Sequence, residues 1–549
     1  MPVLRFKPGR VEEALRLPLR EALEVVERLK IEAEITSDGF VEMEVEVDRP
    51  DMYSLEGIAR QADGLLGRAE GMPRYRVQDS GYVLEAGDVP ARPYIAAGVV
   101  WGVNVDEEYL EELIQFQEKL HTSLGGRREL VAIGLHDLDK LPSRRLSYRL
   151  EPIDKVRFKP LGHAHPMTLK EVLRETAQGR SYGALSLQGR MHPVLYSGDE
   201  VISVPPVINS ELTRIEPGTS NVFVDVTGTN RRLVLDTLSV IVANLAERSR
   251  DRKVGMVTVI SNQGVFKEPK LEPRSASLSA SYTSSVLGTR LEPGEVSRHL
   301  RRMRFDAREE GEDIVIVGIP RYRIDILHPV DLVEEVMLSI GVEELGVTPP
   351  ARMMRGRLLG QRYWEREARK LLAGMGFVEI ISYSLVSCKR LEHLLGVDEK
   401  ELVRLANPVG AESSCMRYSI IPQLLDVARV NQHNIPVRVF EAGEAYSVRG
   451  QKPVARKKLA ILLMDEKAGY EDIQAVVYSL ARLLGDEVVE VREASHPLFI
   501  EGRAAVVKTR HGLEALLGEI RPEILAAENI DYPVAAAEID YSEVAVPRH

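Results

Sequence analysis

RYRIDILHPVDLVEEVMLSI, residues 321–340, joins a turn to an amphipathic helix and follows the strand-like segment IVIVGIP, residues 314–320. A helix continued from Asp331 has an apolar face formed by Leu332, Val333, Val336, Met337 and Ile340. Asp331, Glu334 and Glu335 are spaced i, i+3 and i+4, so they fall together on the opposite face. We therefore predict a strand, a turn and an acidic helix that organise this part of the chain.

The acidic residues of this stretch admit two interpretations. Carboxylates from a strand end and a helix N-terminus can converge on one point, and hard divalent cations such as Mg²⁺ prefer such oxygen ligands. Alternatively, the helix macrodipole stabilises acidic residues in the first turn by about 0.3–1 kcal/mol each, and Arg321 and Arg323 neutralise the remaining charge. The candidate metal ligands are Asp325, Asp331, Glu334 and Glu335.

The composition is that of a globular protein with several domains. A chain of 549 residues is too long for one core, and its length predicts about three to four domains. Hydrophobic residues make up 44% and charged residues 28% of the chain. No apolar run approaches the roughly 20 residues of a membrane span, and the N-terminus lacks the apolar segment of a secretory signal. The net charge of −11 argues against a generic nucleic-acid binder, whose surface is usually basic.

Cysteine usage predicts a reducing compartment. Cys388 and Cys415 are the two cysteines of the chain, so neither a disulfide framework nor a cysteine-based zinc site is expected. We expect both side chains to be thiols, in the core or at the surface, and we expect the protein to reside in the cytoplasm.

Patterns in the first half of the chain predict two regions. In residues 1–90 we expect a helix over 11–30 that Pro18 kinks or splits, a strand over 40–47 and a helix capped by Ser54. An irregular segment at 68–93, rich in Gly, Pro and Asp, marks the boundary. The second region, residues 91–268, contains a β-α-β unit made of a strand, a helix and a strand at 222–226, 235–248 and 254–260.

Two further regions are predicted beyond residue 268. The acidic stretch belongs to a small region, residues 269–347, with a helix over GEVSRHLRRM (294–303). VTPPARM, 347–353, is a Pro-rich linker. Residues 354–549 contain several strand candidates with helices between them, a pattern that favours an antiparallel sheet covered by helices.

Six segments carry a resemblance that spans nearly the whole chain, in the right order. They are DRPDMYSLEGIARQADGLLG, QFQEKLHTSLGGRRELVAIGLHDLDKL, VISVPPVINSELTRIEPGTSNVFVDVTGT, PRYRIDILHPVDLVEEV, LANPVGAESSCMRYSIIPQLL and HPLFIEGRAAVV. Together they resemble the β subunit of phenylalanyl-tRNA synthetase, a class II aminoacyl-tRNA synthetase, in its archaeal and eukaryotic form. The resemblance implies a multidomain α+β fold: an N-terminal α/β domain, an editing-type α/β domain, a small metal-associated domain and a class II synthetase-like antiparallel sheet with helices.

The same resemblance implies a function shared with a partner chain. The family forms a heterotetramer of two α and two β chains that uses ATP and Mg²⁺ to attach phenylalanine to tRNA(Phe), with the aminoacylation site on the α chain. The β chain supplies assembly, tRNA contacts and hydrolysis of tyrosine wrongly attached to the tRNA. A magnesium site shared with the α chain lies on the acidic strand–helix element, at positions that correspond here to Asp325, Asp331, Glu334 and Glu335.

Residues 354–549 resemble a class II catalytic domain without its catalytic residues. RVFEAGEAY, 438–446, is similar to the second class II motif through Arg438 and Glu441. An active site would also need further arginines aimed at the ATP phosphates, because the transition state is polyanionic. The C-terminal tail offers no glycine-rich turn with an arginine, and the chain has no GxxxxGK[ST] loop. We interpret this region as structural and partner-binding.

Candidate editing residues come from the segments that carry the resemblance: Ser203, Asn209, Asp225 and Thr227, with His136 and Asp137 as further candidates. Asp225 and Thr227 alternate in VFVDVT and share one face of a strand. A polar site can separate tyrosine from phenylalanine, because a site built to bind a hydroxyl rejects the analogue that lacks it. Ordinary turn and capping roles explain each residue equally well.

The chain has two arginine-rich runs, RSRDRK (248–253) and RRMR (301–304). They could contact tRNA phosphates, and solvated helix faces explain them equally well. Two alternative functions stay open at this point: a stand-alone hydrolase of mischarged tRNA, and a non-catalytic scaffold.

Overall fold

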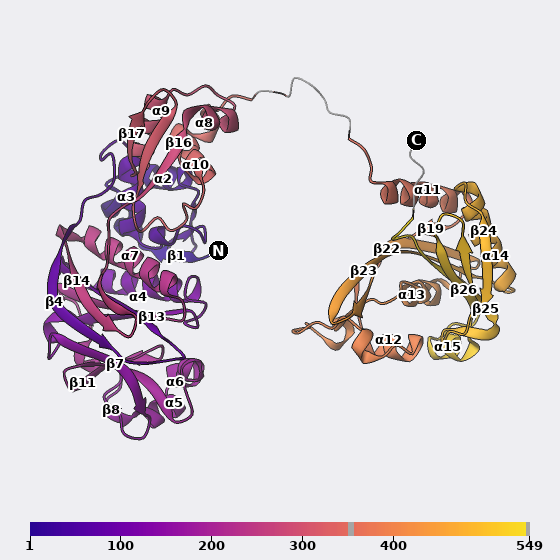
Figure 1. Ribbon diagram of the computed structural model, residues 1–549, viewed down its shortest axis with the longest axis horizontal. Coiled ribbons are helices and arrows are strands. Elements are labelled where there is room, and N and C mark those ends of the chain that lie inside the picture. Colours follow the sequence, from indigo (N-terminus) through magenta and orange to yellow (C-terminus); the bar gives the residue numbers. More distant parts are fainter. Residues whose placement is uncertain (348, 350–355, 545–549) are drawn as a thin grey trace. The chain divides into compact units, whose positions relative to one another are not determined.

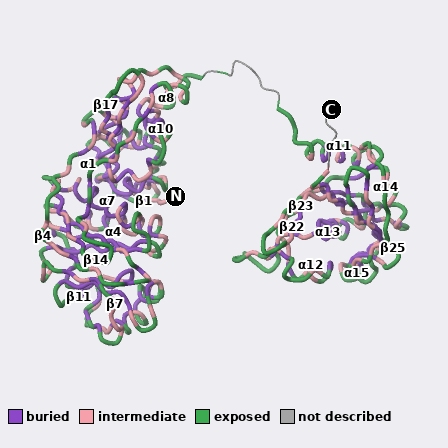
Figure 2. The backbone as a smooth tube through the Cα atoms, viewed as in Figure 1, coloured by how far each residue is buried: buried purple, intermediate pink, exposed green. Residues whose placement is uncertain are grey.

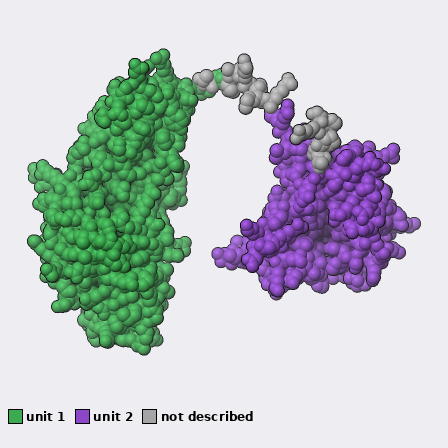
Figure 3. Space-filling view, in the orientation of Figure 1, with its two compact units in different colours: residues 1–349 green, residues 350–549 purple. Residues whose placement is uncertain are grey.

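The computed structural model describes residues 1–347, 349 and 356–544. The chain forms two compact units, Met1–Pro349 and Pro350–His549, which we call unit 1 and unit 2 (Figure 3). The linker predicted at 347–353 falls on the boundary between them, and its residues 348 and 350–353 lie outside the described part. The boundaries predicted near residues 90 and 268 both fall inside unit 1.

Unit 1 begins with a small antiparallel sheet of order β1-β3-β2. Pro18 splits the predicted 11–30 helix as expected, since it is the N-cap of the second of the two helices found there. The Ser54 side chain accepts a hydrogen bond from the Gly57 N–H and caps the next helix, as predicted. The elements are β1 (Val3–Phe6), α1 (Pro8–Leu15), α2 (Leu19–Arg28), β2 (Glu32–Ile35), β3 (Val41–Glu44), η1 (Pro50–Met52) and α3 (Leu55–Leu65).

A large mixed sheet forms the centre of unit 1 (Figure 1). Its strands run in the order β12-β11-β10-β7-β4-β14-β5-β13-β6, and β15 pairs with β14. They are β4 (Arg76–Ala86), β5 (Tyr94–Val103), β6 (Val131–Asp137), β7 (Arg145–Pro152), β10 (Met191–Ser197), β11 (Glu200–Val204), β12 (Ile208–Asn209), β13 (Asn221–Gly228), β14 (Ser249–Ser261) and β15 (Gly264–Glu268). The accompanying elements are α4 (Glu107–Thr122), α5 (Leu169–Glu175), α6 (Ala177–Tyr182), α7 (Arg231–Arg248), β8 (Arg157–Phe158) and β9 (Met167–Thr168).

The predicted β-α-β unit is present in this sheet. Strands β13 and β14 are each antiparallel to β5, which lies between them, so they run parallel to each other. Helix α7 connects them and packs on β5, β13 and β14, with all but one side chain buried from Val234 to Ala246. Strand β13 is buried almost throughout, and this position makes it the anchor of the site described below.

The prediction that residues 68–93 are irregular is wrong. Strand β4 occupies Arg76–Ala86 and pairs in parallel with both β14 and β7. Most of its side chains are exposed or half-buried, and its register with β14 shifts near Gly81. An apolar alternation is therefore absent, and the strand is held by backbone pairing that local sequence does not reveal.

The small region has the predicted elements. Strands β16 (Arg274–Ser279), β18 (Ile314–Ile319) and β17 (Asp306–Glu310) form an antiparallel sheet, and the helices are α8 (Ala280–Leu287), α9 (Pro293–Arg302) and α10 (Pro329–Ile340). On α10, Leu332, Val333 and Val336 are buried as predicted. Glu335, predicted on the face opposite the apolar one, is buried with its side chain only 3% exposed, because its carboxylate pairs with the buried Arg323.

Unit 2 contains the predicted antiparallel sheet with helices on both faces (Figure 2). Helices α12, α13 and α15 contribute to one core, whereas α11 and α14 contribute to the other. The strand order is β19-β22-β23-β27-β26-β25-β24, with only β19 parallel to its neighbour. The main elements are α11 (Gly360–Gly374), β19 (Val378–Glu379), α12 (Cys388–Leu395), α13 (Ile421–Asn431), β22 (Val437–Arg449), β23 (Lys452–Met464), α14 (Tyr470–Leu483), β24 (Val488–Glu493), β25 (Phe499–Thr509), β26 (Glu514–Ile520), α15 (Pro522–Ala527) and β27 (Val534–Asp540).

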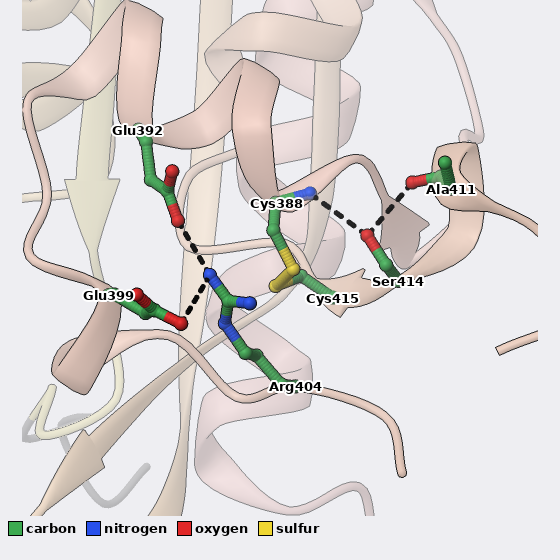
Figure 4. Close-up of a disulfide and its surroundings, with 7 residues drawn as sticks. All are labelled: Cys388, Glu392, Glu399, Arg404, Ala411, Ser414 and Cys415. Atoms are coloured by element: carbon green, nitrogen blue, oxygen red, sulfur yellow. Dashed lines mark hydrogen bonds and ion pairs between the residues drawn. A yellow bond between two sulfur atoms is a disulfide. The ribbon is translucent and has the colours of Figure 1, made fainter. Parts of the chain in front are cut away.

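The two cysteines are joined, so the prediction of two thiols is wrong (Figure 4). Cys388 at the start of α12 and Cys415 on the short strand β21 (Cys415–Met416) form a disulfide. The Cys388 N–H also donates a hydrogen bond to the Ser414 hydroxyl at 3.2 Å. Composition could not reveal the bond, because it depends on two segments 27 residues apart meeting in the fold.

Removing this disulfide is expected to lower the free energy of unfolding of unit 2 by about 3 kcal/mol, since the bond closes a loop in the unfolded chain. The change is Cys388→Ser together with Cys415→Ser, and fluorescence of Trp364, which lies in unit 2, reports the denaturant midpoint. Dithiothreitol should destabilise the wild type and leave the double variant unaffected. Two free thiols in the purified wild type, found by mass spectrometry after alkylation, would contradict the assignment.

In the described part of the chain, no helix combines the length and apolar character that crossing a membrane requires.

Candidate functional site

A cavity of about 530 Å³ opens beside strand β13 in unit 1, and we call it the β13 pocket. Three of the four predicted editing residues line its wall: Ser203, Asn209 and Asp225. Ser203 and Asn209 lie opposite each other on the paired strands β11 and β12, whereas Asp225 lies on β13, far from both in the strand order. The sheet therefore brings together residues that the sequence analysis selected separately.

Asp225 is held at the base of the pocket by His136. The His136 Nε2 lies 2.8 Å from Asp225 Oδ1, and its Nδ1 lies 2.7 Å from the Thr213 hydroxyl. Both side chains of the pair are at most 1% exposed. Gly134 makes this arrangement possible, because a Cβ at that position would lie 2.1 Å from Asp225 Oδ1. Within the described residues Asp225 Oδ2 forms no hydrogen bond, and because Asp225 lines the pocket, we take this oxygen as the one that a ligand would contact.

Ser203 and Asn209 form a second polar pair on the wall. The Ser203 hydroxyl donates to Asn209 Oδ1 at 2.9 Å, and Asn209 Nδ2 donates to the Leu135 carbonyl at 3.2 Å. The side chains are thus oriented by the sheet itself. Neither ring nitrogen of His136 is available to the Ser203 hydroxyl, and so the pocket holds no serine–histidine nucleophile of the hydrolase type.

Thr227 is buried behind the pocket and does not line it. Its hydroxyl accepts a hydrogen bond from Arg92 Nε at 2.9 Å, and Arg92 Nη2 donates to the Arg128 carbonyl at 3.0 Å. Burial lowers the pKa of Arg92 to about 10. Asp137 also lies away from the pocket, where it accepts a hydrogen bond from the Thr219 hydroxyl at 2.9 Å.

The pocket is also lined by a charged pair that no sequence pattern singled out. Arg128 donates to Glu118 at 2.5 Å and lies 4.5 Å above the ring of Tyr182, which belongs to α6. Burial acts to raise the pKa of Glu118, but the His121 hydrogen bond and the Arg128 charge prevail and lower it to about 2. The signal was the GGRR turn, in which Gly126, Arg127 and Arg128 all have positive φ.

The predicted metal ligands are not gathered into one cluster. Asp331 accepts hydrogen bonds from the backbone N–H groups of Leu327 and His328, each at 2.7 Å, and so caps α10. Glu334 pairs with Lys30 at 2.8 Å near the surface. Asp325 and Glu335 both bind Arg323, at 2.6 and 2.5 Å.

A metal ion does not fit this arrangement. The donors are oxygens, which suit Mg²⁺, and Glu335 Oε2 is buried without a hydrogen-bond partner. The Arg323 guanidinium, however, already binds both Asp325 and Glu335, so their carboxylates are neutralised by a side chain. Among the residues that the structure describes, no group of three or more His, Cys, Asp or Glu side chains is placed to hold a metal.

In the class II-like motif of unit 2, Glu441 forms hydrogen bonds and an ion pair with other residues of the chain. Glu441 is 3% exposed and binds Arg417 at 2.6 Å and the Ser382 hydroxyl at 2.6 Å. Arg417 lies so close to Gly443 that a Cβ there would be 2.2 Å from its Nη2. Arg438 is exposed instead of facing this group. The glutamate therefore stabilises the fold, and its carboxylate is not available to a nucleotide.

Comparison with known proteins gives matches over the whole chain. Residues 346–541 match a family model described as the phenylalanyl tRNA synthetase beta chain CLM domain, and residues 276–342 match the tRNA synthetase B5 domain. The phenylalanine–tRNA ligase β subunit of Aeropyrum pernix is 46% identical over 548 residues, 99% of each chain. That of Sulfurisphaera tokodaii is 37% identical over 550 residues, again 99% of each chain.

A solved structure matches unit 1. It is an N-terminal fragment of the phenylalanyl-tRNA synthetase β subunit from Pyrococcus horikoshii, with 32% sequence identity and a TM-score of 0.58. The match covers 62% of this chain and 99% of the fragment.

Proposed function

The chain belongs to the family of phenylalanine–tRNA ligase β subunits, and from that membership we propose how its parts serve the ligase. The chain joins an α chain in a heterotetramer of two α and two β chains, in the cytoplasm. This complex attaches phenylalanine to tRNA(Phe) with ATP and Mg²⁺. The aminoacylation site lies on the α chain, and this chain contributes assembly, tRNA contacts and editing.

Exposed apolar side chains on unit 2 support an obligate partner. Four large hydrophobic side chains are more than 60% exposed between β19 and the turn before β21: Val378, Ile381, Tyr383 and Val409. Exposed apolar residues that form one contiguous patch mark an interaction site. The α chain is the partner that would cover these side chains.

The internal pairing of Glu441 supports an aminoacylation site elsewhere. The test is phenylalanine-dependent charging of tRNA(Phe) by this chain alone and then with an α chain added. Activity only in the mixture is expected. Charging by this chain alone would require an ATP site within unit 2 and would refute the proposal.

The meeting of Ser203, Asn209 and Asp225 in one pocket carries the editing proposal. The Asp225 carboxylate would accept a hydrogen bond from the phenol of a misattached tyrosine. A phenylalanine side chain would leave the Asp225 Oδ2 atom without a partner, a cost of about 1–3 kcal/mol. A bound water would then attack the ester, since no side chain is arranged as a nucleophile. Thr227 is a positioning residue, because it orients Arg92 and through it the loop that bears Arg128.

Glu334 tests whether the acidic helix takes part in assembly. Glu334→Ala is expected to weaken association with the α chain about tenfold, yet to change unfolding of the isolated chain by less than about 1 kcal/mol, because its pair with Lys30 is solvent-exposed. Lys30→Ala removes the same pair and should leave association unchanged. Equal losses of stability with and without the α chain would contradict the assembly role. Association is measured by titration of the α chain with fluorescence detection.

A further inference from the structure

The two arginine-rich runs of the sequence meet at a second cavity in unit 1. This cavity shares no lining residue with the β13 pocket. Its volume is about 290 Å³, and its walls come from α1, α3, the end of α7, the start of β14 and the turn after α9. Five arginines face it: Arg10, Arg60, Arg248, Arg252 and Arg304. We call it the arginine cavity.

Four of these arginines are already neutralised by carboxylates. Arg10 binds Glu112 at 3.0 Å, and Arg60 lies 3.4 Å from Asp51. Arg248 lies 2.6 Å from Asp106, and Arg252 lies 2.7 Å from Glu247. Their charges are satisfied within the protein.

Arg304 is the exception. It is only 5% exposed, and within the described residues its side chain forms no hydrogen bond or ion pair; its Nε is buried without a partner. A buried and unpaired charge is costly, by several kcal/mol in general, unless a ligand or counter-ion completes it.

The backbone is shaped to hold this guanidinium in place. Arg304 has a φ of 68°, in the left-handed region that residues other than glycine seldom adopt. Its side chain crosses α3 at Gly64, where a Cβ would lie 2.6 Å from the Arg304 Cδ. Strain of this kind persists where the surrounding structure over-determines it, and it gathers at ligand sites.

We propose that the arginine cavity binds a small oxyanion of the phosphate class, inorganic phosphate or a phosphate monoester, through the Arg304 guanidinium. A guanidinium presents paired N–H donors that match a phosphate in a bidentate manner. The near-complete burial of Arg304 favours a small ligand over the backbone of a nucleic acid.

The acidic residues around the cavity do not oppose an anion. Glu247 is held by Arg252 and by the Tyr75 hydroxyl, and Asp63 is held by Arg16. Burial raises the pKa of Glu56 to about 7, so that its carboxyl is partly protonated at neutral pH and can donate to an oxyanion.

Binding should stabilise unit 1, because the ligand contacts a cavity formed by segments from residue 10 to residue 304. A ligand that binds only the folded state raises the melting temperature, and the stabilisation grows with the logarithm of one plus the ratio of free ligand concentration to Kd.

The test is calorimetric titration of the full chain with inorganic phosphate, at ionic strength held constant with chloride. Saturable binding with one site per chain is expected, and Arg304→Gln should weaken it at least tenfold. Arg298→Gln is the matched control: this arginine on α9, the helix that precedes the Arg304 turn, is 56% exposed, pairs with Glu295 and does not line the cavity. Ala59→Leu fills the cavity without changing charge and should also abolish binding, which keeps the test valid if Arg304→Gln folds poorly.

Three outcomes would overturn the proposal. They are an absence of saturable binding to the wild type at millimolar phosphate, equal affinity in Arg304→Gln, and a defect of Arg304→Gln confined to tRNA binding. The last would assign the arginine to nucleic acid instead of a small anion.

Discussion

Replacement of Arg323 by methionine is expected to lower the free energy of unfolding of unit 1 by about 3–5 kcal/mol, because it strips a cation from a buried ion-pair network. Arg323 is 1% exposed and binds Asp325 and Glu335. Asp325 would lose its buried cation, and Glu335 would retain only Arg49, at 3.7 Å. Methionine fills similar space and packs readily, so the loss would reflect charge more than a cavity.

The network explains why the effect should be large and confined to unit 1. From Glu335 it continues to Arg49 at 3.7 Å and then to Asp51 at 2.9 Å. Asp51 lies 3.4 Å from Arg60 of α3. The opposing charges hold the pKa of Asp51 at about 2, although burial alone would raise it. One network of buried charges therefore ties the N-terminal elements to the small region that carries α10.

Two tryptophans make the measurement specific. Trp101 lies in unit 1 and Trp364 in unit 2, so Trp364→Phe leaves Trp101 as the reporter of unit 1 during denaturation. Arg321→Met is the matched control, because Arg321 is 27% exposed and lies 3.5 Å from Asp236. A loss below about 1 kcal/mol in Arg323→Met would contradict the network's role.

The same variant tests the predicted metal site. With Arg323 gone, Asp325 loses its cation and Glu335 retains only the more distant Arg49. Mg²⁺ would then stabilise Arg323→Met more than the wild type if these carboxylates can coordinate it. An equal response of both proteins to Mg²⁺ would count against a metal site at this position.

The local sequence pattern correctly predicted the elements that depend on contacts between residues close together in the chain. The acidic helix, the Ser54 cap and the split at Pro18 each depend on neighbours within one or two turns. The β13 pocket was partly predictable as well, because Asp225 lies on a strand and Ser203 beside the Pro-Pro pair, in segments that carry the family resemblance.

Features set by distant partners escaped prediction. The sequence predicts Glu335 as a candidate metal ligand, but in the fold its carboxylate pairs with Arg323. It predicts Cys388 as a thiol, but β21 brings Cys415 to it. Thr227 shares a strand face with Asp225, yet Arg92 occupies the space in front of it. In each case a long-range contact outweighs the local pattern.

Replacement of Asp225 by alanine is expected to reduce hydrolysis of tyrosyl-tRNA(Phe) by at least about 100-fold and to leave phenylalanine charging unchanged. The side chain lines the pocket while its Oδ1 is fixed by His136 at 2.8 Å, so the carboxylate is pre-oriented for a hydroxyl donor. The reconstituted complex with an α chain is assayed with preformed tyrosyl-tRNA, and phenylalanine charging in the same preparation shows that the variant is folded and assembled.

Asp137→Ala is the control variant. It shows whether a loss of hydrolysis in Asp225→Ala comes from the pocket or from the loss of any buried carboxylate in this sheet. Asp137 is also a buried aspartate at the end of β6, next to His136, but its contacts are Thr219 and Lys140, away from the pocket. Its variant should retain hydrolysis even if it is less stable. Unchanged clearance of tyrosyl-tRNA in Asp225→Ala would remove Asp225 from the site, whereas equal losses in both variants would mean that sheet integrity, not a contact with the tyrosine hydroxyl, controls editing.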